Sequence, residues 1–222
     1  ICLILTLALL LGAAPGFAYT QSDYYDLGIS HLTELTYESA SLAEDEFRAA
    51  GNHELAHYYL IYATAMREIF SLSLPEGTVA EPNIALTIRR LQSLEGVDNF
   101  TADLAQRHLP DCESLIVYIQ AKQAERRGDH ALACHTYATI PETLDAYERY
   151  FALIPQAYAQ GVALFEAEDY IGAMTALEGM RYQDSASYYQ QAYARVNPTP
   201  TPTPLPTTAT ITVYYRATDG TE

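Results

Sequence analysis

The chain has 222 residues, of which 49% are hydrophobic, a length and composition typical of a globular protein of one or two domains. Its 28 acidic side chains outnumber the 12 basic ones, which gives a formal net charge of −16 at pH 7. A charge of this sign repels phosphate backbones and anionic lipids, so nucleic acid is excluded as an expected partner. We expect partners that are neutral or cationic.

The first 22 residues carry no charged side chain, and residues 1–17 are almost wholly apolar. With small residues at Gly16 and Ala18, this stretch resembles the apolar part of a secretory signal cleaved near Tyr19. Because no initiator Met or basic leader precedes it, we expect residues 1–18 to be a truncated signal peptide and the protein to be secreted or displayed at the cell surface. The alternative is an uncleaved N-terminal membrane anchor, which needs about 20 apolar residues; no other membrane binding is expected.

Between residues 19 and 196, apolar and small residues recur at three- and four-residue spacing, which indicates helices. Longer helices are expected at residues 52–70, 98–127 (broken at Pro110), 144–168 and 184–195. Short helices are expected to begin, each after a turn, at Tyr37, Ile84, His130 and Tyr170. A helical hairpin that recurs in this way cannot bury its apolar face alone, so the pattern predicts stacking into an α-solenoid.

The clearest motif belongs to the last hairpin. Tyr158-x-x-Gly161-x-x-Leu164 is followed by Tyr170-x-x-Ala173-x-x-x-Leu177-x-x-Met180, with small residues where two helices would approach closely. This pattern resembles the tetratricopeptide repeat, and the continuation Tyr182-Gln-Asp-Ser-Ala is similar to a variant found in exported bacterial repeat proteins. The resemblance implies an all-α, tetratricopeptide-like solenoid of about four helical hairpins over residues 19–196.

The composition changes abruptly after residue 196. Residues 197–208 alternate proline with threonine over most of their length, which predicts a disordered linker of extended polyproline II character that acts as a stiff spacer. Residues 209–222 contain Ile211-Thr-Val-Tyr-Tyr215 before Asp219-Gly220, a strand and turn pattern. That pattern is similar to the opening of a β repeat in bacterial surface proteins, so we expect the beginning of a truncated β module.

The segment His53-Glu54-Leu55-Ala56-His57 matches the motif of zinc peptidases, in which two histidines on one helix face bind zinc and the glutamate activates a bound water. Its context favours chance, because Gly51-Asn52 interrupts the helix directly before it and no strand precedes it. The segment also parallels residues 128–133, which lack the glutamate, so we interpret His53 as a turn residue. A zinc metallopeptidase is kept as an alternative function, and no metal or cofactor is expected.

Each long helix carries a tyrosine followed three residues later by glycine or alanine; these tyrosines are Tyr25, Tyr62, Tyr118 and Tyr158. In tetratricopeptide-like proteins, which the chain resembles, the first helices of the hairpins line a concave groove. The four tyrosines are therefore a candidate ladder facing such a groove, where rings with hydroxyl groups suit extended peptides or glycans. The competing interpretation is that they pack between adjacent hairpins.

These patterns predict a non-catalytic, exported scaffold that presents a helical-repeat surface to a protein or peptide. A cell-wall or glycan-binding surface protein is the alternative among binding proteins. No catalytic residue is assigned, because the sequence contains neither the glycine pattern of nucleotide-binding loops nor the Gly-x-Ser-x-Gly pattern of serine hydrolases.

Overall fold

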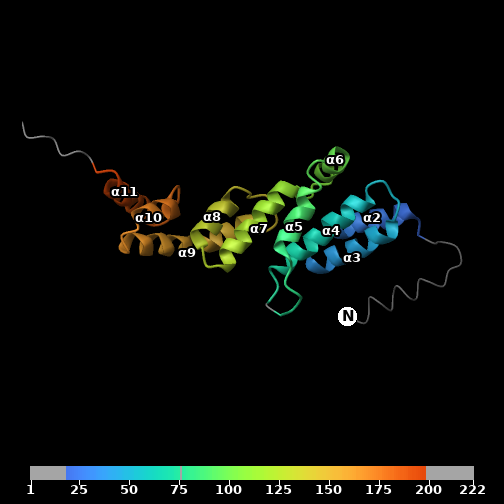
Figure 1. Cartoon of the computed structure of the whole chain (residues 1–222), viewed down its shortest axis with the longest axis horizontal. Helices are drawn as coiled ribbons and strands as arrows, with labels where there is room; N and C mark the ends of the chain where they lie inside the picture. Colours follow the sequence, from blue (N-terminus) through green and yellow to red (C-terminus); the bar gives the residue numbers. More distant parts are fainter. Residues whose placement is uncertain (1–18, 76, 199–222) are drawn as a thin grey trace, which may run out of the picture.

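The structure is a computed structural model that describes residues 19–75 and 77–198. Within this described part the chain forms ten helices and no strand, arranged along one elongated molecule (Figure 1). The helices are α2 (Gln21–Leu32), α3 (Tyr37–Ala50), α4 (Ala56–Ser71), α5 (Ile84–Gln92), α6 (Asp98–Gln106), α7 (Cys112–Arg126), α8 (His130–Ala138), α9 (Ala146–Glu166), α10 (Tyr170–Leu177) and α11 (Ser185–Val196). The prediction of an all-α, repeat-like fold is confirmed.

Two parts of the sequence-based prediction fall outside the described residues. These are the signal peptide at 1–18 and, toward the other end, nearly all of the 197–208 linker together with the β module at 209–222. Of the helices that the structure describes, none combines the length and the apolar character needed to span a membrane.

The helices pack in chain order. Hairpins form from α2 with α3, α4 with α5, α7 with α8 and α9 with α10, and α11 packs against α10 and α9 at one end. Each short second helix begins where the sequence predicts, at Tyr37, Ile84, His130 and Tyr170. Contacts between successive hairpins come from α3 with α4, α5 with α7 and α8 with α9. Every hairpin thus buries its apolar face against its neighbours, which is the arrangement of a solenoid-like stack.

Polar residues start the short helices. The side chain of the N-cap residue accepts a hydrogen bond from a backbone amide of the first turn, which satisfies a donor that the helix itself leaves free. These N-caps are Thr36, Asn83, Asp129 and Asp169. The helix predicted at residues 52–70 begins only at Ala56, as α4. Gly51 ends α3 with a φ of 57°, the left-handed conformation that glycine adopts without strain.

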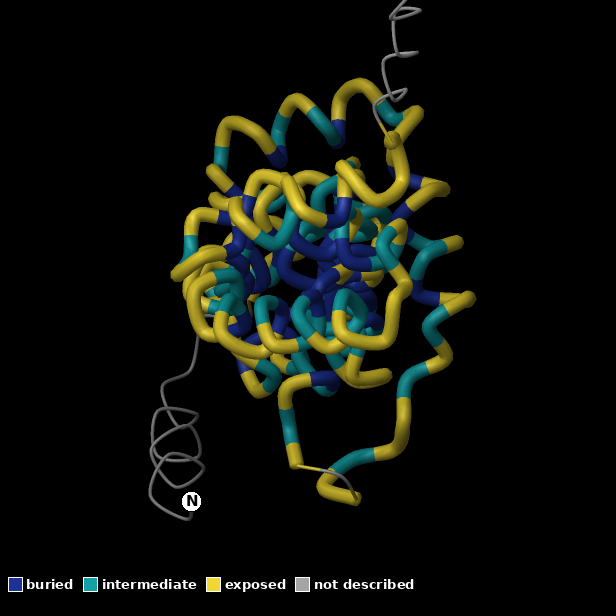
Figure 2. Tube along the Cα trace, turned by 90° about the vertical axis from the view of Figure 1, so that its left-hand side faces the viewer, coloured by how far each residue is buried: buried dark blue, intermediate teal, exposed yellow. Residues whose placement is uncertain are grey.

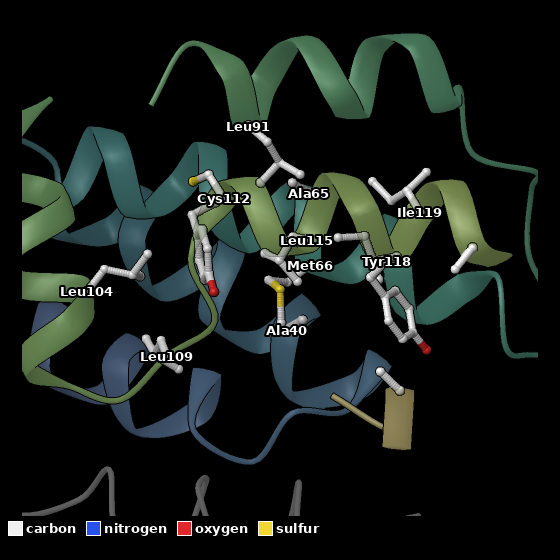
Figure 3. Packing of buried hydrophobic residues seen from close by; sticks show 14 of the residues in the cluster. Ala40, Ala65, Met66, Leu91, Leu104, Leu109, Cys112, Leu115, Tyr118 and Ile119 are labelled. Carbon is white, nitrogen blue, oxygen red and sulfur yellow. The ribbon is translucent and has the colours of Figure 1, made fainter. Parts of the chain in front are cut away.

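Small residues let the helices approach closely. A Cβ atom added to Gly28 would lie 2.9 Å from the Phe47 ring, and one added to Gly161 would lie 2.5 Å from a methyl carbon of Leu177. The small residue of each Tyr-x-x-Gly/Ala pair therefore faces the packed interior. Figure 3 shows the same close packing within and between hairpins, where Leu91 of α5 points toward Ala65 of α4 in its own hairpin and toward α7 of the next. An end-on view places the buried residues along the middle of the stack (Figure 2).

Helix α6 departs from the hairpin pattern. The sequence predicted one long helix broken at Pro110, whereas the structure has two separate helices, α6 and α7, with Asp111 as the N-cap of α7. The fully buried ring of Phe100 fixes α6 against α4, with ring centroids 5.0 Å from Tyr59 and 5.9 Å from Tyr62. Helix α6 is thus an inserted element that covers the first helices of the first two hairpins.

Candidate functional site

The four tyrosines of the predicted ladder lie on α2, α4, α7 and α9, the first helices of the four hairpins. Tyr25, Tyr62 and Tyr118 are 4%, 0% and 3% exposed, and Tyr158 is partly buried. The first three rings pack within the helical layers, which corresponds to the packing interpretation of the sequence. They do not form an exposed row in this structure.

In the last two hairpins, the tyrosine hydroxyls connect one long helix to the beginning of the next. Tyr118 donates to Asp145, the N-cap residue of α9, at 2.5 Å. Tyr158 donates in the same way to Asp184, the N-cap residue of α11. Burial and the Asp145 carboxylate both raise the pKa of Tyr118, so its hydroxyl remains a proton donor. These bonds hold successive hairpins at a fixed spacing.

The tyrosines of the first two hairpins bond to the inserted segment instead. Tyr62 donates to the backbone carbonyl of Pro110 at 2.7 Å. The Asp103 carboxylate of α6 accepts hydrogen bonds from Tyr25 at 3.2 Å and from Tyr59 at 2.7 Å. Arg107 donates to the same carboxylate at 2.7 Å. We refer to Tyr25, Tyr59, Asp103 and Arg107 as the N-terminal cluster.

A second cluster of the same kind joins α7, α8 and α9. Asp145 accepts from Tyr118 and from Nε of Arg149, the latter at 2.9 Å. Arg149 also donates to Glu125 at 3.1 Å, and Tyr137 donates to Glu125 at 3.0 Å. We refer to these five residues as the C-terminal cluster. In both clusters an arginine follows an aspartate by four residues, and one of the two is the cap residue of the helix that carries the other. Tyrosines from other helices bond to both clusters, and Glu125 joins the second.

The zinc-peptidase motif does not adopt the geometry that its chemistry requires. Helix α4 begins at Ala56, so His53 lies in the preceding turn while His57 lies in the first turn of the helix. The His53 ring stacks on Tyr25 with centroids 3.8 Å apart, and Glu54 and His57 are exposed. The two histidines therefore do not stand one turn apart on one helix. Across 19–75 and 77–198, no three His, Cys, Asp or Glu side chains gather as a metal site.

The turn that contains His53 recurs elsewhere in the chain. The amide of Ala56 donates to the carbonyl of His53 at 3.1 Å, and the same bond joins Ala146 to Thr143 at 3.0 Å and Ser185 to Tyr182 at 3.1 Å. These turns lead from one hairpin into the next, whereas residues 128–133 lie within a hairpin. The predicted parallel between 51–56 and 128–133 is therefore wrong, although His53 is a turn residue as interpreted.

An open groove runs beside the third hairpin. Its larger part has a volume of about 620 Å³ and lies between the α2–α3 turn, the α6–α7 segment and the α8–α9 turn. Its smaller part has a volume of about 410 Å³ and continues past Phe70 and Tyr118. The two parts are neighbours, because Leu35 and Leu144 line both, and we call them together the acidic groove.

The lining of the acidic groove combines apolar surface with carboxylates. Leucine, isoleucine and proline side chains contribute much of it, and His108 is the one histidine among the described lining residues. No lysine or arginine is found in this lining. The acidic side chains are Asp111, Glu142, Asp145 and Glu148. Asp145 also belongs to the C-terminal cluster, where burial acts to raise its pKa but the hydrogen bonds from Tyr118 and Arg149 outweigh this effect and lower it.

Only part of this site could be read from the sequence. Tyr118 was singled out and does line the smaller part of the groove, whereas Tyr25, Tyr62 and Tyr158 do not line either part. Leu35 and Leu144 were missed because each lies in a turn with a φ near 50°, a conformation that leucine seldom adopts and that no sequence pattern signals. Comparison with protein-family models, curated proteins and solved structures finds no match to the chain.

Proposed function

We propose that the protein is a non-catalytic, tetratricopeptide-like scaffold whose acidic groove binds an extended peptide segment with cationic and apolar side chains. The observation that carries this proposal is the lining itself, which combines apolar surface with the carboxylates of Asp111, Glu142 and Glu148 and contains no basic side chain. The fourth carboxylate, that of Asp145, is already paired with Arg149. Apolar contacts provide affinity, and the carboxylates select a partner of opposite charge.

The shape of the groove favours a peptide over a compact ligand. Its two parts extend from the α6–α7 segment to the first turns of α9, with their walls formed by turns from separate hairpins. Stacked hairpins offer extended binding surfaces of this kind. The tetratricopeptide-like assignment is supported by the sequential packing of the hairpins and by the close contact of Gly161 with Leu177. The apolar sequence of residues 1–18 supports export to the cell surface or beyond.

Calorimetric titration with two synthetic peptides tests the proposal. One peptide alternates arginine with leucine, and the other replaces each arginine by glutamate. The full chain is expected to bind the arginine peptide and not the glutamate peptide, with an affinity that falls as salt is added. Equal binding of both peptides, or of neither, contradicts the proposal.

Variants then place the binding site. The Asp111→Asn/Glu142→Gln double variant removes two groove carboxylates, and asparagine retains the ability to cap α7. Its affinity for the arginine peptide is expected to fall about three- to tenfold, as the loss of two exposed ion pairs gives. The matched control, Asp26→Asn/Glu178→Gln, removes the same charge at exposed positions outside the groove. An equal loss in the control would assign the effect to net charge alone.

A further inference from the structure

A second hollow lies at the beginning of α9 and shares Pro141 with the lining of the acidic groove. Its volume is about 220 Å³. It is lined by Tyr137, Ala138, Pro141, Tyr147, Tyr150 and Phe151. Four of these six residues are aromatic, and none carries a formal charge at neutral pH. We call it the aromatic hollow.

The rings at its rim are exposed and mutually oriented. Tyr147 is 54% exposed and Phe151 is 51% exposed, although they lie one turn apart on the same helix. Their ring centroids are 4.8 Å apart in an edge-to-face arrangement, and the Tyr150 and Phe151 centroids are 5.0 Å apart. The two exposed rings of Tyr147 and Phe151, supported by the partly buried Tyr150, offer a preformed apolar contact surface.

The absence of charge in this lining indicates the chemistry of the ligand. In a chain with 28 acidic side chains, a lining without Asp or Glu offers no attraction to a cationic peptide. Aromatic-lined hollows with tyrosine hydroxyls suit uncharged proline-rich segments, whose extended form is stiff and loses little entropy on binding. The sequence contains such a segment at residues 197–208, with prolines at 198, 200, 202, 204 and 206 and no charged residue.

We propose that the aromatic hollow binds the proline-rich segment 197–208 of a second copy of the chain. Within one molecule the distance is unfavourable. Helix α11 packs on the far half of α9, where the Tyr188 ring lies 5.2 Å from that of Phe165. Phe165 lies about 27 Å along the helix from Tyr147, at 1.5 Å per residue. A polyproline segment rising 3.1 Å per residue would use about nine residues merely to cover that distance.

Binding between copies makes the association head-to-tail. Each copy offers one hollow at the beginning of α9 and one proline-rich segment after α11, and Figure 1 shows the described chain ending at the far end of the molecule, beyond α11. Because the two surfaces differ, each bound copy leaves a free hollow and a free segment at the ends of the assembly, so chains of several copies form as concentration rises.

Sedimentation velocity of the full chain over a range of concentrations tests this inference. The wild type is expected to associate, and Phe151→Ser is expected to lower the association constant about tenfold or more, as the loss of an aromatic anchor does. Ile171→Ser is the matched control, because Ile171 is also an exposed apolar residue but lies outside the hollow. Association equal to that of the wild type in Phe151→Ser, or a monomeric wild type, overturns the proposal. Circular dichroism verifies folding, and Tyr147→Ser provides a second variant of the hollow.

Complementation provides the sharper result. The Pro202→Ser/Pro204→Ser variant retains the hollow but has an altered segment, whereas Phe151→Ser retains the segment. Each is expected to remain monomeric alone, and their mixture is expected to form a dimer and nothing larger. A synthetic peptide with the sequence of residues 197–208 should bind the proline variant and not Phe151→Ser. Failure of the mixture to dimerise overturns the inference and leaves the arginine-peptide test of the acidic groove unaffected.

Discussion

The two halves of the molecule use the same tyrosine position in different ways. In the N-terminal half, Tyr25 of α2 and Tyr62 of α4 face the inserted helix α6 and the segment that follows it. In the C-terminal half, Tyr118 and Tyr158 bond to the N-cap residue of the next long helix, and the acidic groove stays open beside Tyr118. The inserted segment thus provides the hydrogen-bond partners of the first two tyrosines, although Tyr118 of the C-terminal half is just as buried, at 3% exposed.

The two clusters differ in what they hold together. In the N-terminal cluster the aspartate belongs to α6, so its bonds to Tyr25 and Tyr59 attach a covering helix. In the C-terminal cluster Asp145 belongs to α9 and its bonds align consecutive hairpins. Loss of the first cluster should release a helix, whereas loss of the second should loosen an interface.

The largest expected difference is between alanine variants of Tyr62 and Tyr158. Tyr62 is fully buried and contacts the Phe100 ring, so Tyr62→Ala should cost about 3–5 kcal/mol of unfolding free energy, as aromatic truncations in cores do. Tyr158 is only partly buried, so Tyr158→Ala should cost about 1–2 kcal/mol. Urea denaturation of both variants measures the difference. Similar losses would remove the distinction between the two halves.

A smaller difference is expected between the two aspartates. Asp103→Asn leaves three donors without their carboxylate and should cost about 2–4 kcal/mol. Asp145→Asn affects two donors at a side chain that is 45% exposed, and should cost about 1–2 kcal/mol.

Hydrogen exchange distinguishes the mechanisms of these two variants. In Asp103→Asn, amide protection should fall most in α6, while α8 and α9 keep theirs. An even loss of protection along the whole chain would contradict the role of Asp103 as the attachment of a covering helix.

Acid should weaken both clusters. Burial acts to raise the pKa of Asp103, but the hydrogen bonds from Arg107 and Tyr59 have the larger effect and lower it. The pKa values of Asp103 and Asp145 therefore both lie below the ordinary value of 3.8. Since the unfolded carboxylates protonate first, their stabilisation is complete above pH 3.8 and is lost as pH falls through the lower folded value. Urea denaturation between pH 6 and pH 2 should show a steep loss at the acidic end, reduced in Asp103→Asn.

The smallest expected effect concerns Lys122, the one lysine of the chain, which has no counterpart in the N-terminal cluster. It is buried with its ammonium 5.9 Å from the centre of the Tyr118 ring, and none of the ion pairs between described residues includes it. Burial lowers the pKa of Lys122, so keeping its ammonium charged in the folded state costs free energy of folding.

Lys122→Met removes that cost and keeps the apolar contact. Stability at pH 7 should stay equal or rise by about 1 kcal/mol. The wild type should gain stability as pH rises toward 10.5, because the folded lysine releases its proton first, and the variant should not. A clear loss of stability in Lys122→Met would show that the ammonium contributes favourably to the C-terminal cluster.

The sequence predicted the hairpins well and the site poorly, for physical reasons. Helix starts such as Tyr37 and Tyr170 follow polar caps, and Gly161 marks a close approach, so local chemistry specifies them. The covering role of α6 depends on contacts such as that of Asp103 with Tyr25, 78 residues apart in the chain. No local pattern contains that information. The sequence therefore left open whether the four tyrosines are exposed in a groove or packed between hairpins.

We expect peptide to bind in the acidic groove, between the α6–α7 segment and the first turns of α9, and not at the covered tyrosines of α2 and α4. Hydrogen exchange of the full chain with and without the arginine–leucine peptide tests it most directly. We predict that bound peptide raises protection in the α6–α7 segment, the α8–α9 turn and the first turns of α9, which line the acidic groove. Protection that rises instead in α2 and α4, around Tyr25 and Tyr62, would contradict the account.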